Sequence, residues 1–261
     1  MKNKKLSFAV LLVLALVLFS WHTEAVNAEP LSDDAFINLC VASASHVVEN
    51  AIQAGANPNA QRADGITALM TAATRNSHPE VINVLIRNNA NINAVDQGGR
   101  TALMMAAANN PNVEVTAALL RNGANVNARS SSGGTALIGA AGDNRNAEVT
   151  ALLLRSGADL NAADRYGRTA LMMAAANNPN EAVTAMLMRG ADFNARCSRG
   201  FTALMAAAQA SGNPEVITQL LNGGADARIS DGNGRRAVDF ARNNSAIFNT
   251  DVFRRLESIS P

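Results

Sequence analysis

The sequence predicts an all-α repeat solenoid of stacked helix-turn-helix-hairpin units, and three observations support this prediction. The twelve residues TALMMAAANNPN occur twice without a change, at positions 101–112 and 169–180. The triplet T-A-L recurs at intervals of 34, 34, 34 and 33 residues, at Thr67, Thr101, Thr135, Thr169 and Thr202. Glycine keeps the same period two residues before each triplet, at Gly65, Gly99, Gly133, Gly167 and Gly200. One structural unit is therefore copied along the chain.

Residues 96–129 show what one unit is expected to form. Thr101 is a good N-cap, because its hydroxyl can accept a hydrogen bond from the first helical turn, and residues 102–108 are strong helix formers. Proline fits a helix only in its first turn, so a second helix is expected to begin at Pro111. Residues 113–121 then carry apolar side chains at the i, i+3, i+4 spacing of an amphipathic helix.

Glycines mark the turns of the unit. Gly123 follows the second helix, where a left-handed residue commonly ends a helix, and its equivalent Asn89 is the next-best residue for that conformation. Gly99 is expected to supply a positive φ in the hairpin that leads to the next unit. Such short helix pairs cannot bury enough apolar surface alone, so they must stack. An apolar fraction of 48% with 4% aromatic residues fits a thin aliphatic core.

The repeated pattern D-x-x-G-x-T-A-L-M-M-A-A…E-V-x-x-L-L-x-x-G-A-x-V-N-A resembles the ankyrin repeat, and the resemblance covers essentially everything after Pro30. At residues 101–104 the family's T-P-L-H becomes T-A-L-M, so a helix-setting proline and a histidine that bonds the threonine hydroxyl are lost. The loop between the helices is also one residue longer than usual. The resemblance implies a stack that binds protein partners on a concave surface of hairpin tips and inner helices.

The repeat pattern divides the chain into a leader, two caps and five central repeats. Residues 1–28 are expected to be a signal peptide, 29–61 an N-terminal capping repeat without a T-A-L opening, and 231–261 a C-terminal capping repeat. An N-capped helix is expected over residues 250–257. The five central repeats are expected at 62–95, 96–129, 130–163, 164–196 and 197–230.

The N-terminal segment has the order of a secretory signal peptide. Residues 1–5 are basic, residues 6–21 are mostly apolar, and the small residues of positions 26–28 offer a cleavage site after Ala28. The apolar run is shorter than the roughly 20 residues that a spanning helix needs. We therefore expect a secreted or periplasmic protein that is attached to a membrane only if this segment stays uncleaved.

The charge balance argues against nucleic-acid binding. Cleavage would remove Lys2, Lys4, Lys5 and Glu24, leaving 19 of the 22 basic and 20 of the 21 acidic residues, a net charge of −1. A nucleic-acid-binding protein needs a basic footprint instead. All remaining basic residues are arginine. We interpret this as compositional bias; the alternative is avoidance of lysine in a lysine-modifying environment such as a host cytosol.

The two cysteines are expected to remain free thiols. A disulfide brings two Cα atoms within about 7 Å, and Cys40 and Cys197 lie more than four repeats apart in a linear stack. Cys40 is expected to be a small buried helix residue. Cys197 takes the place of the hairpin aspartates Asp96 and Asp164, and we expect it to be partly exposed.

The sequence contains no recognisable catalytic or metal-binding motif. HExxH, CxxC, GxSxG and phosphate-binding glycine loops do not occur, and only His46 and His78 follow the leader, on different units. Asp143 and Asp239 have no partner at a catalytic spacing. We therefore predict a non-enzymatic protein with no cofactor and no metal.

The resemblance implies that a partner contacts the hairpin tips and the far ends of the first helices. Arg165, Tyr166, Arg168, Arg199 and Phe201 place the single tyrosine, three arginines and a phenylalanine on two adjacent hairpins. Arginine and tyrosine dominate interface energetics, so these five are the main candidates. The alternative is that Phe201 packs on its own hairpin and the arginines only solubilise. Further candidates on the same surface are Gln97, Arg100, Asn109, Asp143 and Asn177.

The sequence therefore predicts a monomeric protein-protein interaction module that acts outside the cytoplasm on a protein partner of unknown identity. Two alternatives remain open. A secreted effector delivered into a host would have host proteins as its targets. An envelope structural protein that assembles with itself would form concentration-dependent oligomers without any added ligand.

Overall fold

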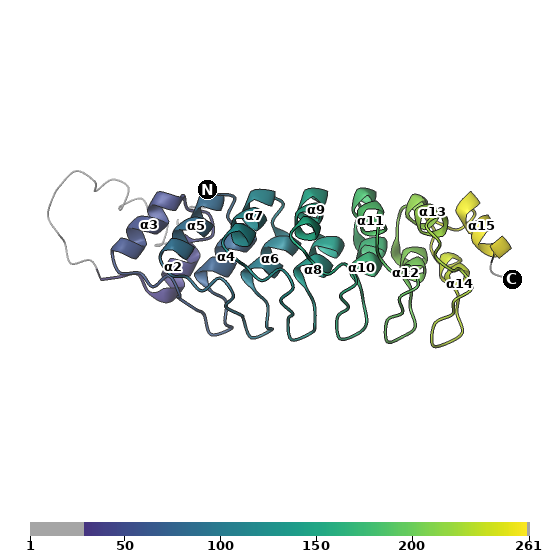
Figure 1. Cartoon of the computed structure of the whole chain (residues 1–261), viewed down its shortest axis with the longest axis horizontal. Coiled ribbons are helices and arrows are strands. Elements are labelled where there is room, and N and C mark those ends of the chain that lie inside the picture. The colour runs from purple at the N-terminus through teal and green to yellow at the C-terminus, as the bar shows by residue number, and fades with distance from the viewer. Residues whose placement is uncertain (1–28, 260–261) are drawn as a thin grey trace, which may run out of the picture.

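The computed structural model describes residues 29–259 and shows an elongated stack of helix pairs (Figure 1). The first helices of the pairs form an inner row of α2 (Asp33–Leu39), α4 (Ala68–Arg75), α6 (Ala102–Asn109), α8 (Ala136–Asp143), α10 (Ala170–Asn177), α12 (Ala203–Ala210) and α14 (Ala237–Ala241). The second helices form an outer row of α3 (Ser45–Gln53), α5 (Pro79–Arg87), α7 (Val113–Arg121), α9 (Ala147–Arg155), α11 (Glu181–Leu187), α13 (Pro214–Asn222) and α15 (Asp251–Ile259).

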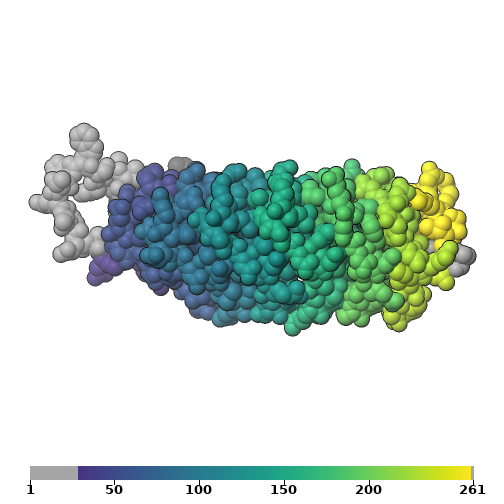
Figure 2. Space-filling view, viewed as in Figure 1, coloured from purple at the N-terminus to yellow at the C-terminus, as the bar shows by residue number. Residues whose placement is uncertain are grey.

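Each unit packs against its sequence neighbours. Inner helices contact inner helices and outer helices contact outer helices along the whole row. The colours of the space-filling view accordingly run in chain order along the long axis (Figure 2). The predicted all-α repeat solenoid is confirmed, and the boundaries assigned to the individual repeats stay predictions.

Threonine caps the inner helices α4, α6, α8, α10 and α12, as the sequence predicted. The hydroxyl of Thr101 accepts a hydrogen bond from the backbone N–H of Met104 at 3.3 Å, and Thr135 accepts one from Ile138 at the same distance. These bonds satisfy N–H groups that have no partner within the helix. Helix α6 ends at Asn109, one residue beyond the predicted segment.

The prediction that an outer helix begins at Pro111 is wrong. Helix α7 begins at Val113, and its N-cap is Asn112, whose side-chain oxygen accepts a hydrogen bond from the backbone N–H of Glu114 at 3.1 Å. An asparagine cap of this kind can define the helix start without a proline in the first turn. Pro79 of α5 does occupy a first-turn position.

The predicted left-handed residues are confirmed at the turns. Gly123 has a φ of 88° and Asn89 a φ of 65°. Gly99 has a φ of 70°, and a Cβ atom there would lie 2.7 Å from the backbone nitrogen of Ser131 in the next hairpin. Glycine at this position therefore permits both the turn and the close stacking of neighbouring hairpins.

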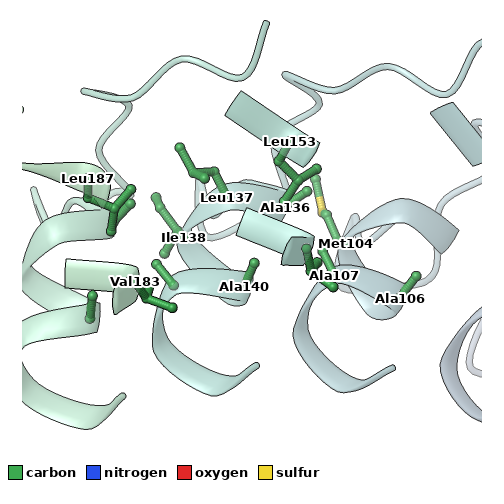
Figure 3. Close-up of a cluster of buried hydrophobic side chains, with 14 of the residues drawn as sticks. Met104, Ala106, Ala107, Ala136, Leu137, Ile138, Ala140, Leu153, Val183 and Leu187 are labelled. Atoms are coloured by element: carbon green, nitrogen blue, oxygen red, sulfur yellow. The ribbon is translucent and has the colours of Figure 1, made fainter. Parts of the chain in front are cut away.

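Alanine lets the inner helices approach closely, and larger side chains fill the seams between units (Figure 3). Ala106, Ala107 and Ala140 are completely buried, while Leu137 and Leu153 are buried between neighbouring units. The core is therefore one continuous row of small and branched aliphatic side chains along the stack.

A ladder of buried asparagine amides joins consecutive units at the turn between the helices of each pair. The Asn144 amide donates to the carbonyl oxygens of Ala107 and Asn110, at 2.9 and 3.0 Å. Equivalent bonds to the preceding unit are made by Asn76, Asn110, Asn178 and Asn244. Ser211 occupies the same position in its unit, but its hydroxyl bonds only to the backbone of Asn213 in its own loop.

Both ends of the described chain are helix pairs. The first segment contains α2, capped by Ser32, as well as α3. The predicted C-terminal helix is confirmed as α15, and the hydroxyl of Thr250 accepts a hydrogen bond from the backbone N–H of Phe253 at 3.2 Å. None of the described helices has both the length and the apolar character needed to cross a membrane. The predicted signal peptide lies outside the described residues.

The expectations for the two cysteines hold only in part. Both are free thiols, as predicted. Cys40 is buried but follows α2 as its C-cap instead of lying within a helix, and burial raises the pKa of its thiol to about 12. Cys197 is 9% exposed, so the prediction of partial exposure is wrong. Its backbone N–H pairs with the carbonyl of Phe201 at 2.9 Å, and Gly167 of the preceding hairpin packs directly against it.

Candidate functional site

Within residues 29–259, backbone hydrogen bonds close six hairpins. These hairpins project beyond the inner helices on one edge of the stack (Figure 1). They are residues 62–66, 96–100, 130–134, 164–168, 197–201 and 231–235. We call these hairpins, together with the exposed ends of the inner helices, the hairpin face.

Backbone hydrogen bonds join the hairpins into one row. Arg165 donates its backbone N–H to the carbonyl of Ser132 at 2.9 Å, and Ser198 donates to the carbonyl of Tyr166 at 2.7 Å. The other hairpins are joined by equivalent bonds. The side chains on this row are therefore held at regular intervals by their backbone.

A buried aspartate organises the hairpin at 164–168. The Asp164 carboxylate accepts hydrogen bonds from the backbone N–H groups of Tyr166 and Arg168, at 2.8 and 2.9 Å, and from Nε of Arg168 at 2.7 Å. Burial of the carboxylate opposes its ionisation, but the bonds from Arg168 and Tyr166 outweigh burial and lower the Asp164 pKa below its ordinary value. Asp96 and Asp231 organise their hairpins in the same way.

Tyr166 stands at the tip of this hairpin with arginines beside its ring. It is 48% exposed, the largest exposed fraction of any aromatic side chain among residues 29–259. The guanidinium carbons of Arg165 and Arg168 lie 5.4 and 5.3 Å from the ring centroid, within the range of a cation–π contact. The tyrosine is therefore presented outward by a rigid hairpin and flanked by positive charge.

A hollow of about 320 Å³ lies between this hairpin and the next one. Tyr166 and Arg168 line one side, and Cys197, Ser198 and Arg199 line the other. Three of the five main candidates thus line one hollow, and Arg165 lies beside the tyrosine ring.

Phe201, the fifth main candidate, does not lie on this surface. It is only 8% exposed, and its ring centroid is 4.8 Å from that of Phe240 in the following unit. The guanidinium of Arg199 covers it, 5.2 Å from the ring centroid. Phe201 therefore packs against Arg199 of its own hairpin, as the alternative predicted, and also against the following unit, which neither prediction included.

A second hollow, of about 360 Å³, lies near the N-terminal end of the hairpin face. Two predicted residues, Arg100 and Asn109, line it. Thr74 and Arg75 also line it and lie at the far end of a first helix, where the partner-binding surface was predicted; the other lining residues were missed: Asn38, Val41, Arg62, Ile66, Met70, Thr71 and Met105. The hairpin period continues one unit toward the N-terminus, to residues 62–66, and would have predicted that Arg62 and Ile66 lie on the hairpin face.

The comparison with known families agrees with this architecture. A family model described as ankyrin repeats (3 copies) matches residues 38–130, 103–197 and 171–256, most of the chain. The chain belongs to the ankyrin-repeat family. No curated protein matches it in sequence. Ankyrin repeats are protein-protein interaction modules, and proteins built from them are generally non-enzymatic scaffolds.

The remaining predicted residues of this ankyrin-repeat protein are spread along the face. Asp143 and Asn177 are exposed at the ends of α8 and α10 and line neither hollow. The side chain of Gln97 donates to the carbonyl of Ala63 at 2.8 Å and thereby bridges two hairpins. The predicted residues therefore fall into a compact group around Tyr166 and several scattered positions.

The ankyrin repeats between residues 29 and 259 bring no metal-binding cluster together. No group of three or more histidine, cysteine, aspartate or glutamate side chains in this part of the chain is placed to hold a metal ion. His46 lies on α3, whereas His78 precedes α5.

Proposed function

We propose that this ankyrin-repeat protein is a non-enzymatic binding module that acts outside the cytoplasm and holds a protein partner on its hairpin face. Arg165, Tyr166, Arg168 and Arg199 form the centre of the contact, and we call these four residues the Tyr166 patch. The partner contacts side chains on two adjacent hairpins at once.

The exposure of Tyr166 is the observation that carries this proposal. A tyrosine in a monomeric protein can bury its ring or leave it in water, and here nearly half of the side chain is exposed between arginines. Tyrosine and arginine are enriched among interface residues that lose most binding energy when truncated. The hairpin is held by Asp164, so little conformational freedom is lost when a partner binds.

The proposed location rests on the order of charge, apolar run and small residues in positions 1–28. The test is N-terminal sequencing of the exported protein, and we expect it to begin at Glu29. An exported protein that keeps Met1 would instead be anchored, and a protein found only in the cytoplasm would overturn this part of the proposal.

Affinity capture tests the binding function. The full chain, tagged at its C-terminus and expressed in its native organism, is compared with a variant carrying Arg165→Ala, Tyr166→Ala and Arg199→Ala. A matched control carries Arg121→Ala and Arg155→Ala, which remove exposed arginines paired with glutamates on the outer helices. Binding by the wild type and the control, but not by the patch variant, supports the module and its site.

Other outcomes separate the alternatives. A partner retained equally by all three proteins would keep the binding function and remove the Tyr166 patch from it. Capture of nothing except further copies of the chain would favour a self-assembling structural protein. Capture of host proteins alone would favour a delivered effector.

A further inference from the structure

The charges of this protein are unequally distributed between the hairpins and the rest of the stack. Nine arginines lie on the hairpins or directly beside them: Arg62, Arg100, Arg129, Arg165, Arg168, Arg196, Arg199, Arg235 and Arg236. The same segments carry four carboxylates: Asp64, Asp96, Asp164 and Asp231. The rest of residues 29–261 carries ten arginines and sixteen carboxylates. The hairpins are thus basic, although residues 29–261 together have a net charge close to zero.

The imbalance is largest on the three consecutive hairpins from residue 129 to 201. They carry five of the nine arginines and a single carboxylate, Asp164, which is already buried against Arg168. Within residues 29–259, no carboxylate oxygen lies within 4.0 Å of a guanidinium nitrogen of Arg165 or Arg199, the largest distance that counts as an ion pair. These two guanidinium groups are therefore available to an acidic ligand.

The hydrogen-bond donors that this hairpin offers to a ligand belong to side chains and not to the backbone. Asp164 accepts the backbone N–H groups of Tyr166 and Arg168, and those of Asp164, Arg165 and Gly167 bond to carbonyl oxygens. No backbone N–H of the hairpin at 164–168 is left to surround a phosphate in the way that phosphate-binding loops do. Planar guanidinium groups remain, and these match the two oxygens of a carboxylate.

We infer that the Tyr166 patch and the neighbouring hairpins bind an acidic, extended segment of a protein partner. Carboxylate side chains of the segment pair with Arg165 and Arg199, and an apolar part of the same segment covers the ring of Tyr166. This inference rests on the proposed function and adds the chemistry of the partner to it.

The spacing of the units sets the spacing of the acidic residues. Packed helices lie about 8–10 Å apart, so consecutive hairpins follow one another at about that interval. An extended chain in the polyproline II conformation advances about 3.1 Å per residue and has three residues per turn, so every third side chain lies on the same face. An acidic residue at every third position therefore places one carboxylate at each hairpin.

The test uses dye-labelled synthetic peptides of about twelve residues, long enough to reach three hairpins, and fluorescence anisotropy. One peptide has glutamate at every third position between serine and threonine residues. A second replaces each glutamate by glutamine, and a third has the composition of the first with its glutamates clustered at one end. We expect the first to bind at least about tenfold more tightly than the other two, and more weakly as salt increases.

Two double variants test where on the protein the peptide binds. Arg165→Ala with Arg199→Ala is expected to weaken binding of the first peptide by about tenfold or more, whereas Arg121→Ala with Arg155→Ala leaves it unchanged. Circular dichroism melting of each variant confirms that it is folded. Equal binding of the glutamate and glutamine peptides, or an effect of the control variant as large as that of the patch variant, would overturn the inference.

A single-stranded oligothymidine of similar length provides the second arm. Stronger binding of the oligonucleotide than of the acidic peptide would overturn the inference in favour of a nucleic-acid ligand. Affinity capture keeps the two proposals distinguishable. A partner that requires the Tyr166 patch, together with no preference for glutamate over glutamine peptides, would sustain the proposed function and refute the acidic segment alone.

Discussion

Asp164 and Arg168, four residues apart, form an ion pair in which the carboxylate is 3% exposed and the guanidinium 45% exposed. The buried partner holds the hairpin through two backbone N–H groups, while the exposed partner lies beside Tyr166. One aspartate thereby connects the stability of a hairpin to the presentation of the candidate binding residues.

Stability at acidic pH should depend on Asp164. Its pKa is lowered in the folded protein, so the carboxylate stabilises the fold above the ordinary aspartate pKa of about 3.9, and this contribution is lost as pH falls through the folded pKa. We expect Asp164→Asn to cost about 1–3 kcal/mol at neutral pH. The difference between wild type and variant should shrink below about pH 4. Urea unfolding between neutral and strongly acidic pH measures it.

The matched control is Asp143→Asn. The Asp143 side chain is exposed at the end of α8, so its replacement should change the free energy of unfolding by less than about 0.5 kcal/mol at neutral pH. A difference between wild type and Asp164→Asn that stays constant with pH would show that the charge of Asp164 does not stabilise the hairpin.

The asparagine ladder predicts opposite effects at two equivalent positions. Asn144→Ala removes two hydrogen bonds to the preceding unit and leaves the carbonyls of Ala107 and Asn110 without this donor, so we expect a loss of about 2–4 kcal/mol. Ser211→Asn should supply the donor that its unit lacks, because the backbone angles of Ser211 resemble those of Asn144. We expect a gain of about 1 kcal/mol, measured by urea unfolding. Destabilisation by Ser211→Asn would show that the contact between this unit and the preceding one cannot accommodate the amide.

A buried hydroxyl without a partner should be replaceable with a gain in stability. The Thr150 hydroxyl is completely buried on α9 and has no hydrogen-bond partner, while isoleucine occupies the equivalent positions Ile82 and Ile217. Thr150→Val is therefore expected to stabilise the protein by about 1 kcal/mol. Thr135→Val is the control, because it removes the cap of α8 and should destabilise by about 1 kcal/mol. Equal effects of the two substitutions on the unfolding midpoint would contradict this account.

Substitution of Phe201 should reduce stability, whereas substitution of Tyr166 should reduce binding. Phe201→Ala removes the contact with Phe240 between two units, and we expect a loss of about 3 kcal/mol in the free energy of unfolding. Tyr166→Ala changes an exposed tip and should cost less than about 1 kcal/mol while weakening binding of the acidic peptide. Thermal unfolding and peptide anisotropy on both variants check this. The assignment fails if Tyr166→Ala destabilises as much as Phe201→Ala.

Local chemistry made the fold predictable. Thr101, Gly99 and Gly123 each do something that depends on only a few neighbouring residues, namely capping a helix or adopting a positive φ. Because these signals recur five times at a fixed period, the unit and its stacking could be predicted from the sequence. The start of α7 was misplaced because the prediction relied on Pro111 alone, whereas the side-chain cap of Asn112 defines the start of the helix.

The sequence by itself determined the repeat, the helix pair, the free cysteines and the basic, aromatic character of two adjacent hairpins. Only the tertiary structure decided that Phe201 is buried against Phe240, that Cys197 is covered, and that Asn144 crosses to the preceding unit. The physical reason is that these properties depend on the neighbouring unit, whose side chains meet them only after stacking. A period along the chain predicts that units stack, but the contacts across each seam decide which side chains remain exposed for a partner.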